Sequence, residues 1–311
     1  MSGSNLSRRQ AWVAAARPQT LPAAAAPVIV GVGLAVNDGV VAPLPAIAAF
    51  VGAALIQIGT NFANDYYDAI QGADTDDREG FTRVTQSGLI EPGRVKAAMY
   101  LTFAAAVVVG GYLVYVGGVP ILVIGLLSVI SGIAYTGGPY PLGYHGLGDL
   151  FVFIFFGVIA VTGTYYVQAA AALAAPLTTT IPPGTITLEA LVASLPIAAI
   201  STNILVVNNI RDKAEDETTG KRTLAVRFGY AFSRAEYIGL LGMAYLVPIG
   251  LWLATDFSPT VLLPLLTLPV AVRVAETVRT ETSGAALNPA LETTGKLLAG
   301  YALLFGVGLA V

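Results

Sequence analysis

The sequence contains no cysteine and only one histidine among its 311 residues. The absence of cysteine excludes disulfide bonds, thiolate catalysis and cysteine-ligated metals. Charged residues are also scarce, at 11% of the chain, whereas a soluble domain contains about 25%. The formal net charge is −3 and no basic tail is present, so the composition argues against nucleic-acid binding.

Hydrophobic residues make up 55% of the chain, and the mean hydropathy is +0.73. Apolar stretches separate the clusters of charge, and each is long enough to cross a hydrocarbon core about 30 Å thick, which takes about 20 residues. Nine such spans are present, at roughly 20–36, 43–63, 97–116, 119–136, 149–172, 188–208, 235–254, 260–278 and 291–311. Spans three and four meet at Gly117-Gly118-Val119-Pro120, which predicts a tight hairpin. We therefore predict an all-α, polytopic membrane protein, a single domain over 1–311, with nine transmembrane helices bundled around a central cavity.

The basic residues predict the orientation of this bundle in the lipid bilayer. All 16 Lys and Arg lie in the N-terminal tail or in the segments after spans two, six and eight. Because positive charge is enriched in cytoplasmic loops, the N-terminus and the basic segments are expected in the cytoplasm and the C-terminus outside. The polar motifs near 61–96, 135–149 and 208–234 would then share the cytoplasmic side.

Two acidic motifs begin where a span ends on that side. The first supplies Asn64, Asp65 and Asp68, and the second supplies Asn208, Asp212 and Asp216. A spacing of four residues places oxygen atoms on one helix face, one turn apart. Each motif alone could be a solvated acidic loop. Two matched motifs predict a diphosphate held by Mg²⁺, or Mn²⁺, with the four aspartates as metal ligands and the two asparagines as neutral oxygen ligands at the substrate.

A cation follows each acidic motif. Arg83 follows the first, and Lys221 follows the second, directly after Gly220. A nucleotide-binding P-loop is not supported, because Glu215 stands where its first glycine is required. We predict that Arg83 and Lys221 bind phosphate oxygens and compensate the charge of the leaving diphosphate. The alternative is that both only anchor the protein at the cytoplasmic interface.

The segment 135–149 is rich in Gly, Pro and Tyr. Its tyrosines, Tyr140 and Tyr144, either face a flat aromatic substrate or belong to an interfacial aromatic belt. Tyr144 and Asp149 are candidates for orienting that substrate. His145 is either a general base or a loop residue without a role.

These motifs resemble the UbiA-type superfamily of intramembrane prenyltransferases, and the resemblance covers nearly the whole chain. The signature of that superfamily is an Asn/Asp-rich motif after the second span and an Asp-x-x-x-Asp motif after the sixth. The likeness is greatest to members that act on 1,4-dihydroxy-2-naphthoate. It includes Arg17-Pro18-Gln-Thr20-Leu-Pro22, which implies a substrate-binding role for Arg17, and an acid at Asp74 rather than at position 72.

The resemblance implies Mg²⁺-dependent transfer of a polyprenyl group from polyprenyl diphosphate to this aromatic acceptor, with loss of CO2 and diphosphate, in menaquinone biosynthesis. It implies a prokaryotic plasma membrane and no obligate protein partner. A member of the same superfamily with another acceptor, such as 4-hydroxybenzoate or geranylgeranylglyceryl phosphate, is the nearer alternative. The second alternative is a secondary transporter. The acidic residues of a transporter would be expected near the bilayer midplane, whereas here they lie at the ends of spans.

Overall fold

The computed structural model describes residues 6–72 and 83–311, and the expected acid at Asp74 lies outside them. Within these ranges the regular structure is entirely helical. The α-helices are α1 (Arg8–Ala16), α2 (Leu21–Asn37), α3 (Pro43–Ile70), α4 (Pro92–Ala134), α5 (Gly148–Val152), α6 (Ala160–Leu173), α7 (Leu188–Thr218), α8 (Leu224–Ala254), α9 (Leu268–Thr280) and α10 (Gly284–Ala310). Shorter helical turns are η2 (Pro18–Thr20), η3 (Leu142–His145), η4 (Phe153–Ile159, a π-helix) and η5 (Pro259–Thr267).

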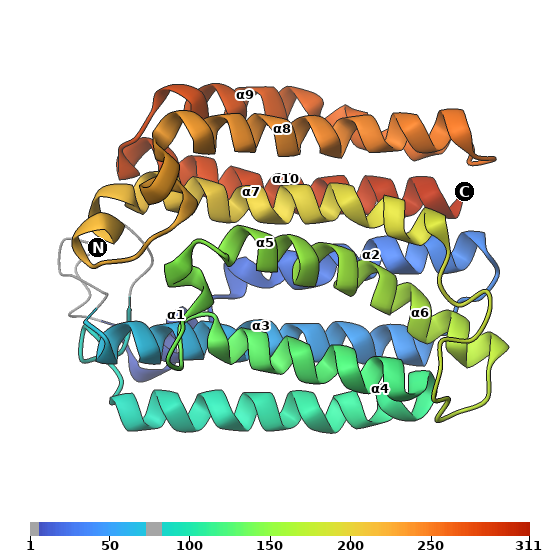
Figure 1. Cartoon of the computed structure of the whole chain (residues 1–311), viewed down its shortest axis with the longest axis horizontal. Helices are drawn as coiled ribbons and strands as arrows, with labels where there is room; N and C mark the ends of the chain where they lie inside the picture. Colours follow the sequence, from blue (N-terminus) through green and yellow to red (C-terminus); the bar gives the residue numbers. More distant parts are fainter. Residues whose placement is uncertain (1–5, 73–82) are drawn as a thin grey trace.

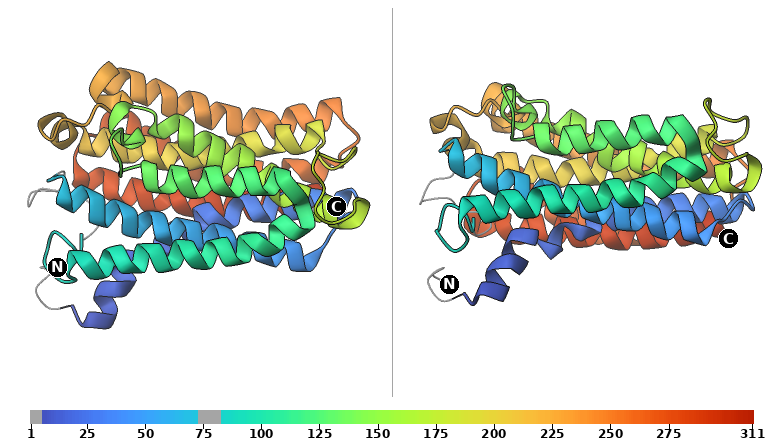
Figure 2. Two further views of the ribbon diagram at one scale, coloured as in Figure 1. Left: turned by 60° about the horizontal axis from the view of Figure 1, so that its bottom comes forward. Right: turned by 90° about the horizontal axis from the view of Figure 1, so that it is seen from below.

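The long helices run side by side along the length of the molecule (Figures 1 and 2). Helix α7 lies in the interior, where Ile197 and Ile200 join the largest cluster of buried apolar side chains. Helices α2 and α10 approach closely because both carry glycine at the crossing: a Cβ at Gly33 would lie 2.3 Å from the carbonyl oxygen of Gly306. Such small-residue contacts are typical of helix packing within membranes.

Over the described residues, eight helices are long and apolar enough to cross a membrane, where the sequence predicts nine spans. The difference arises in α4, which has 43 residues and contains both span 97–116 and span 119–136. Gly118 within it has a non-helical backbone (φ 69°, ψ −156°). The chain reverses there, so that the two parts of α4 lie next to each other (Figures 1 and 2). The hairpin is therefore present, although its two arms are assigned to one helix.

Replacing Gly118 with alanine is expected to lower the melting temperature of the detergent-solubilised protein. The backbone region occupied by Gly118 costs other residues about 1–3 kcal/mol, and a Cβ there would lie 2.0 Å from the carbonyl oxygen of Thr178. Gly239→Ala in α8 is the matched control, because a Cβ at Gly239 meets no atom within 4 Å. Equal melting temperatures for the two variants would contradict the hairpin geometry.

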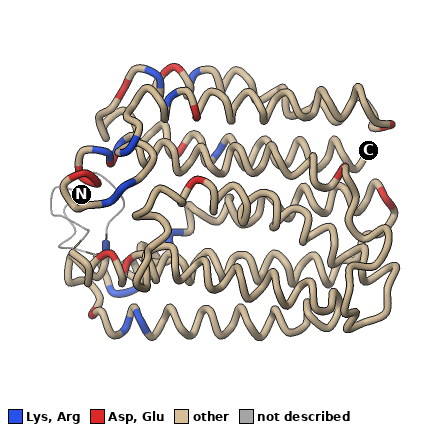
Figure 3. The backbone as a smooth tube through the Cα atoms, viewed as in Figure 1, with Lys and Arg blue, Asp and Glu red and all other residues tan. Residues whose placement is uncertain are grey.

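Lys and Arg positions gather toward one end of the bundle, and none of the described Lys or Arg is drawn at the opposite end (Figure 3). Helices α3 and α7 both finish at the basic end, at Ile70 and Thr218. We call it the motif end, because the two acidic motifs lie in the last turns of these helices. The C-terminal residues of α10 lie at the other end (Figure 1).

An apolar cavity of about 460 Å³ lies between α2, α3, both arms of α4, α6 and the π-helix η4. Tyr135, which follows α4, lines it at the motif end, and Leu113 and Leu122 line it near the hairpin. Phe155 and Phe156 of the π-helix also face it. Short π-helical segments are frequent at functional sites. The predicted central cavity is therefore present.

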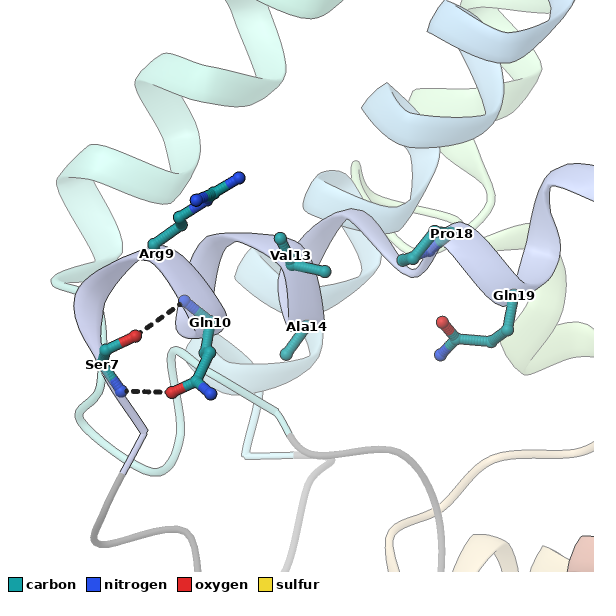
Figure 4. Close-up of a pocket in the computed structure, with 7 residues that line it drawn as sticks. All are labelled: Ser7, Arg9, Gln10, Val13, Ala14, Pro18 and Gln19. Atoms are coloured by element: carbon teal, nitrogen blue, oxygen red, sulfur yellow. Dashed lines mark hydrogen bonds between the residues drawn. The ribbon is translucent and has the colours of Figure 1, made fainter.

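Helix α1 packs against α3 at the motif end. Trp12 meets Phe62 of α3 edge-on, with ring centroids 6.0 Å apart. Ser7 and Gln10 cap the start of α1 reciprocally, beside a shallow depression lined also by Arg9 and Gln19 (Figure 4). Arg17 ends the helix in the left-handed conformation (φ 51°), which turns the chain toward α2.

Candidate active site

Side chains from three other segments meet at the carboxylate of Asp68. It lies near the end of α3 and is only 2% exposed. One oxygen accepts a hydrogen bond from the Arg83 guanidinium (2.7 Å), and the other accepts one from the Tyr144 hydroxyl (2.5 Å). The Lys221 ammonium lies 3.8 Å from that second oxygen. A buried carboxylate needs such partners, and here all of them come from segments that the sequence marked as candidates.

A backbone contact joins segment 135–149 to the loop that carries Lys221. The amide N–H of Arg222 donates to the carbonyl oxygen of Tyr144 (2.7 Å). The Lys221 ammonium lies 4.8 Å from the centroid of the Tyr144 ring, a cation–π distance. Gly146 makes this approach possible, because its φ is +71° and a Cβ would lie 2.9 Å from the Arg222 carbonyl oxygen. Segment 135–149 therefore connects the first motif to the second.

The second acidic motif is organised by Arg211, a residue that the sequence reasoning did not include in the site. Its guanidinium binds both carboxylate oxygens of Asp212, at 2.6 and 2.8 Å, and the side-chain oxygen of Asn208 at 2.9 Å. It also reaches Asn288 of α10 (2.8 Å). With 3% of its side chain exposed, Arg211 is a buried cation. An arginine inside an acidic motif at a span end is the sequence signal that identifies it.

Tyr135 lies close to carboxylates of both motifs. The negative charges near its phenol are those of Asp149, Asp68 and Asp216. A tyrosine phenol is protonated at neutral pH and is available as a hydrogen-bond donor. Asp149 is itself buried, with both carboxylate oxygens 3.4 Å from the amide nitrogen of Asn209. The cavity thus ends, at Tyr135, among carboxylates from α3, α5 and α7.

Asp65, which the sequence predicts to be a metal ligand, binds a neighbouring turn of the chain. Its carboxylate is 0% exposed and accepts hydrogen bonds from the Val84 N–H, the Thr85 N–H and the Thr85 hydroxyl. Both oxygens are therefore used in binding the turn that follows Arg83. The carboxamide oxygen of Asn64 accepts a bond from the Thr136 hydroxyl (2.9 Å), so Asn64 connects α3 to segment 135–149.

Tyr140 and Arg17, two predicted substrate-binding residues, are placed by contacts other than those described for the Asp68 cluster. The ring of Tyr140 is 55% exposed and stacks on His145, with centroids 3.6 Å apart. His145 Nδ1 contacts the carbonyl oxygen of Pro141 (2.8 Å), which orients the imidazole within the loop. Arg17 is buried at the junction of α1 and α2, and Asn61 of α3 binds the neighbouring Ala16 carbonyl.

The donor set fits Mg²⁺ bound together with a phosphate ligand. Within residues 6–72 and 83–311, no three His, Cys, Asp or Glu side chains form a group able to hold a metal by themselves. The buried carboxylates of Asp68, Asp212 and Asp216 lie on two helices instead. Mg²⁺ commonly takes one or two carboxylates and completes its octahedron with water and phosphate oxygens. The residues do not fit an all-protein metal cage.

An apolar cavity that ends among buried carboxylates and cations defines the class of protein: an intramembrane enzyme for a lipid-tailed anionic substrate. The chain belongs to the UbiA prenyltransferase family, whose pattern matches residues 24–289. The predicted family and enzyme class are therefore confirmed.

The similarity to curated relatives extends over the whole length. The 1,4-dihydroxy-2-naphthoate octaprenyltransferase of Mycobacterium tuberculosis is 38% identical over 299 residues, covering 96% of each chain. The enzyme of the same name from Escherichia coli is 38% identical over 316 residues, covering 99% of this chain and 98% of the relative.

Solved structures share the fold at low sequence identity. A UbiA homolog from Aeropyrum pernix K1 superposes with a TM-score of 0.68 at 14% identity, covering 92% of this chain and 96% of the homolog. A UbiA homolog from Archaeoglobus fulgidus bound to DMAPP and Mg²⁺ gives a TM-score of 0.61 at 14% identity, covering 95% of this chain and 99% of the homolog.

Proposed function

We propose that this protein transfers a polyprenyl group from polyprenyl diphosphate to 1,4-dihydroxy-2-naphthoate, releasing CO2 and diphosphate and giving the quinol form of demethylmenaquinone. The observation that carries the proposal is the 38% identity, over at least 96% of both chains, to two relatives named for prenyl transfer to this naphthoate. The site supports it, because an apolar cavity suits a prenyl tail and the adjacent charged cluster suits its diphosphate.

The diphosphate would lie at the motif end. Arg83 and Lys221 would bind its oxygens, and Asp68, Asp212 and Asp216 would hold Mg²⁺. When bound, Mg²⁺ would supply positive charge that stabilises the departing diphosphate. Arg83 and Lys221 add fixed positive charge at the same place, and both are buried, which strengthens their effect.

The prenyl chain would lie in the cavity along α3 and α4, where apolar walls exclude the water that would quench an allylic cation. Tyr135, Tyr144 and Asp149 would orient the acceptor ring beside the first prenyl carbon. The C–O electron pair leaves with the diphosphate, and the ring carbon that carries the carboxylate forms the new C–C bond. The electron pair of the ring–carboxylate bond then returns to the ring as CO2 departs, so no net proton is consumed.

The whole chain would act as one domain in a prokaryotic plasma membrane, with the motif end in the cytoplasm. The support for this orientation is the position of the basic residues, which gather at that end (Figure 3). Because the chain has no cysteine, single cysteines can be introduced without background. In intact cells, a membrane-impermeant maleimide should label Asp256→Cys but not Glu91→Cys, both of which are exposed positions. The reverse pattern would contradict the orientation.

The function is tested with purified protein in lipid nanodiscs, Mg²⁺, a polyprenyl diphosphate and a panel of acceptors. We expect prenylated product from 1,4-dihydroxy-2-naphthoate, identified by mass, and none from 4-hydroxybenzoate or geranylgeranylglyceryl phosphate. Turnover with one of the other acceptors alone would retain the family activity and reject the proposed acceptor. Ion transport into liposomes without consumption of prenyl diphosphate would reject the enzyme proposal.

A further inference from the structure

A turn of the chain carries Arg83 to the site, and this turn is built around the carboxylate of Asp65. The Ser87 N–H and hydroxyl both donate to the Arg83 carbonyl oxygen, at 3.0 and 2.7 Å. The Ile90 N–H donates to the Val84 carbonyl oxygen (3.1 Å). These bonds close the segment on itself, while the amides of Val84 and Thr85 point to Asp65. The turn and the end of α3 are thus a single hydrogen-bonded unit.

The carboxylate of Asp65 is completely buried, and a buried charge is costly unless hydrogen bonds compensate it. Three donors do so here: the Val84 N–H at 3.1 Å, the Thr85 N–H at 3.1 Å and the Thr85 hydroxyl at 2.6 Å. Charge-assisted bonds of this kind are stronger than neutral ones. The carboxylate therefore fixes residues 84 and 85, and with them the backbone from which the Arg83 side chain extends.

Asp65 and Asp68 are three residues apart on α3, so they are neighbours on the helix surface. Asp65 binds the backbone of the turn, and Asp68 binds the Arg83 guanidinium (2.7 Å). The same stretch of α3 therefore binds both the Arg83 guanidinium and the backbone that directly follows Arg83. We infer that Asp65 is a positioning residue that fixes the diphosphate-binding Arg83, and that it is not a metal ligand. The inference rests on the proposed function for the nature of the bound anion.

The test is a double-mutant cycle on the affinity for inorganic pyrophosphate in the presence of Mg²⁺, measured calorimetrically on protein in nanodiscs. Asp65→Asn replaces one acceptor oxygen by an amide N–H₂, which then faces either the donor of Val84 or the donors of Thr85. It should weaken pyrophosphate binding by about ten- to a hundredfold in the wild-type background. In an Arg83→Gln background the same substitution should have almost no effect, because the residue that it positions is already absent. Additive effects in the two backgrounds would overturn the inference.

Two further variants distinguish positioning from loss of folding. Thr85→Val removes one of the three bonds and should shift pyrophosphate affinity in the same direction by a smaller factor. Thr85→Ser keeps the hydroxyl and should restore wild-type affinity. Melting temperatures identify any variant that is merely unfolded. If both Thr85 variants bind pyrophosphate like the wild type while Asp65→Asn does not, the hydrogen bonds between Asp65 and the turn do not explain the loss of affinity.

Metal binding supplies a second readout, taken by Mn²⁺ electron paramagnetic resonance with pyrophosphate present. Asp65→Asn should keep the Mn²⁺ stoichiometry of the wild type, whereas Asp68→Asn should lower it. Loss of bound Mn²⁺ in Asp65→Asn would return Asp65 to the set of metal ligands and reject the inference. Neither measurement requires turnover, so failure of the wild type to prenylate any acceptor would reject the proposed function separately.

Discussion

Replacing Asp68 with asparagine is expected to lower kcat by about a thousandfold while the bundle stays folded. The substitution removes a negative charge that faces both Arg83 (2.7 Å) and Lys221 (3.8 Å). Loss of a metal-ligating carboxylate weakens the charge stabilisation of the leaving diphosphate by several kcal/mol, and about 4 kcal/mol corresponds to a factor of a thousand in rate. The loss should appear in steady-state formation of prenylated naphthol at saturating Mg²⁺ and substrates.

Asp38→Asn is the matched control. Asp38 also accepts a 2.5 Å hydrogen bond from a tyrosine, Tyr165, but it follows α2 at the end of the bundle opposite the motifs. The control should retain wild-type turnover, and both variants should elute as monodisperse protein. Turnover near the wild-type rate in Asp68→Asn would refute the assignment of this cluster as the diphosphate site.

The second large effect concerns Lys221→Gln. The Lys221 ammonium lies beside Asp68 and over the ring of Tyr144. In the proposed reaction it would face charge that grows on the diphosphate as the C–O bond breaks. An interaction that strengthens in the transition state contributes to kcat and not only to KM. We expect kcat to fall by about a hundredfold at saturating prenyl diphosphate, the scale for losing one electrostatic donor in an active site.

Lys296→Gln is the control for this variant, because Lys296 is exposed and forms an ion pair with Glu292 (2.6 Å) on the same helix. Exposed pairs contribute little, so its kcat should equal that of the wild type. A change in KM alone for Lys221→Gln would mean that Lys221 captures substrate without assisting the bond cleavage. An unchanged kcat and KM would reduce it to an interfacial anchor.

The hydrophobic spans could be predicted from sequence because a bilayer imposes length and polarity on every crossing helix. The hairpin at Gly118 was readable from its Gly-Gly-x-Pro pattern. The break between α1 and α2 was less readable, because Arg17 adopts a left-handed backbone (φ 51°) that favours glycine. The π-helix Phe153–Ile159 depends on packing against α7, where a Cβ at Gly157 would lie 2.1 Å from the Cβ of Ala198. No local sequence pattern encodes that contact.

The candidate site, too, could be predicted from the sequence only in part. The convergence of Asp68, Arg83, Tyr144 and Lys221 was predictable in kind, since paired acids and cations at span ends indicate a bound anion. The different roles of Asp65 and Asp68 on α3 were not predictable, because helical spacing alone cannot tell a carboxylate that faces the site from one that binds a neighbouring turn. Asp65 and Asp68 differ only in tertiary partners. The role of Arg211 likewise depends on Asn288, which is 77 residues away in sequence.

The most direct measurement of the central claim uses 1,4-dihydroxy-2-naphthoate labelled with ¹⁴C in its carboxyl group. Purified protein in nanodiscs, supplied with Mg²⁺ and polyprenyl diphosphate, should release labelled CO2, diphosphate and prenylated naphthol in equal amounts. Omission of polyprenyl diphosphate should abolish the release of CO2, because decarboxylation follows from attack on the prenyl carbon. Diphosphate released without CO2, or CO2 released without prenyl diphosphate, would contradict the account.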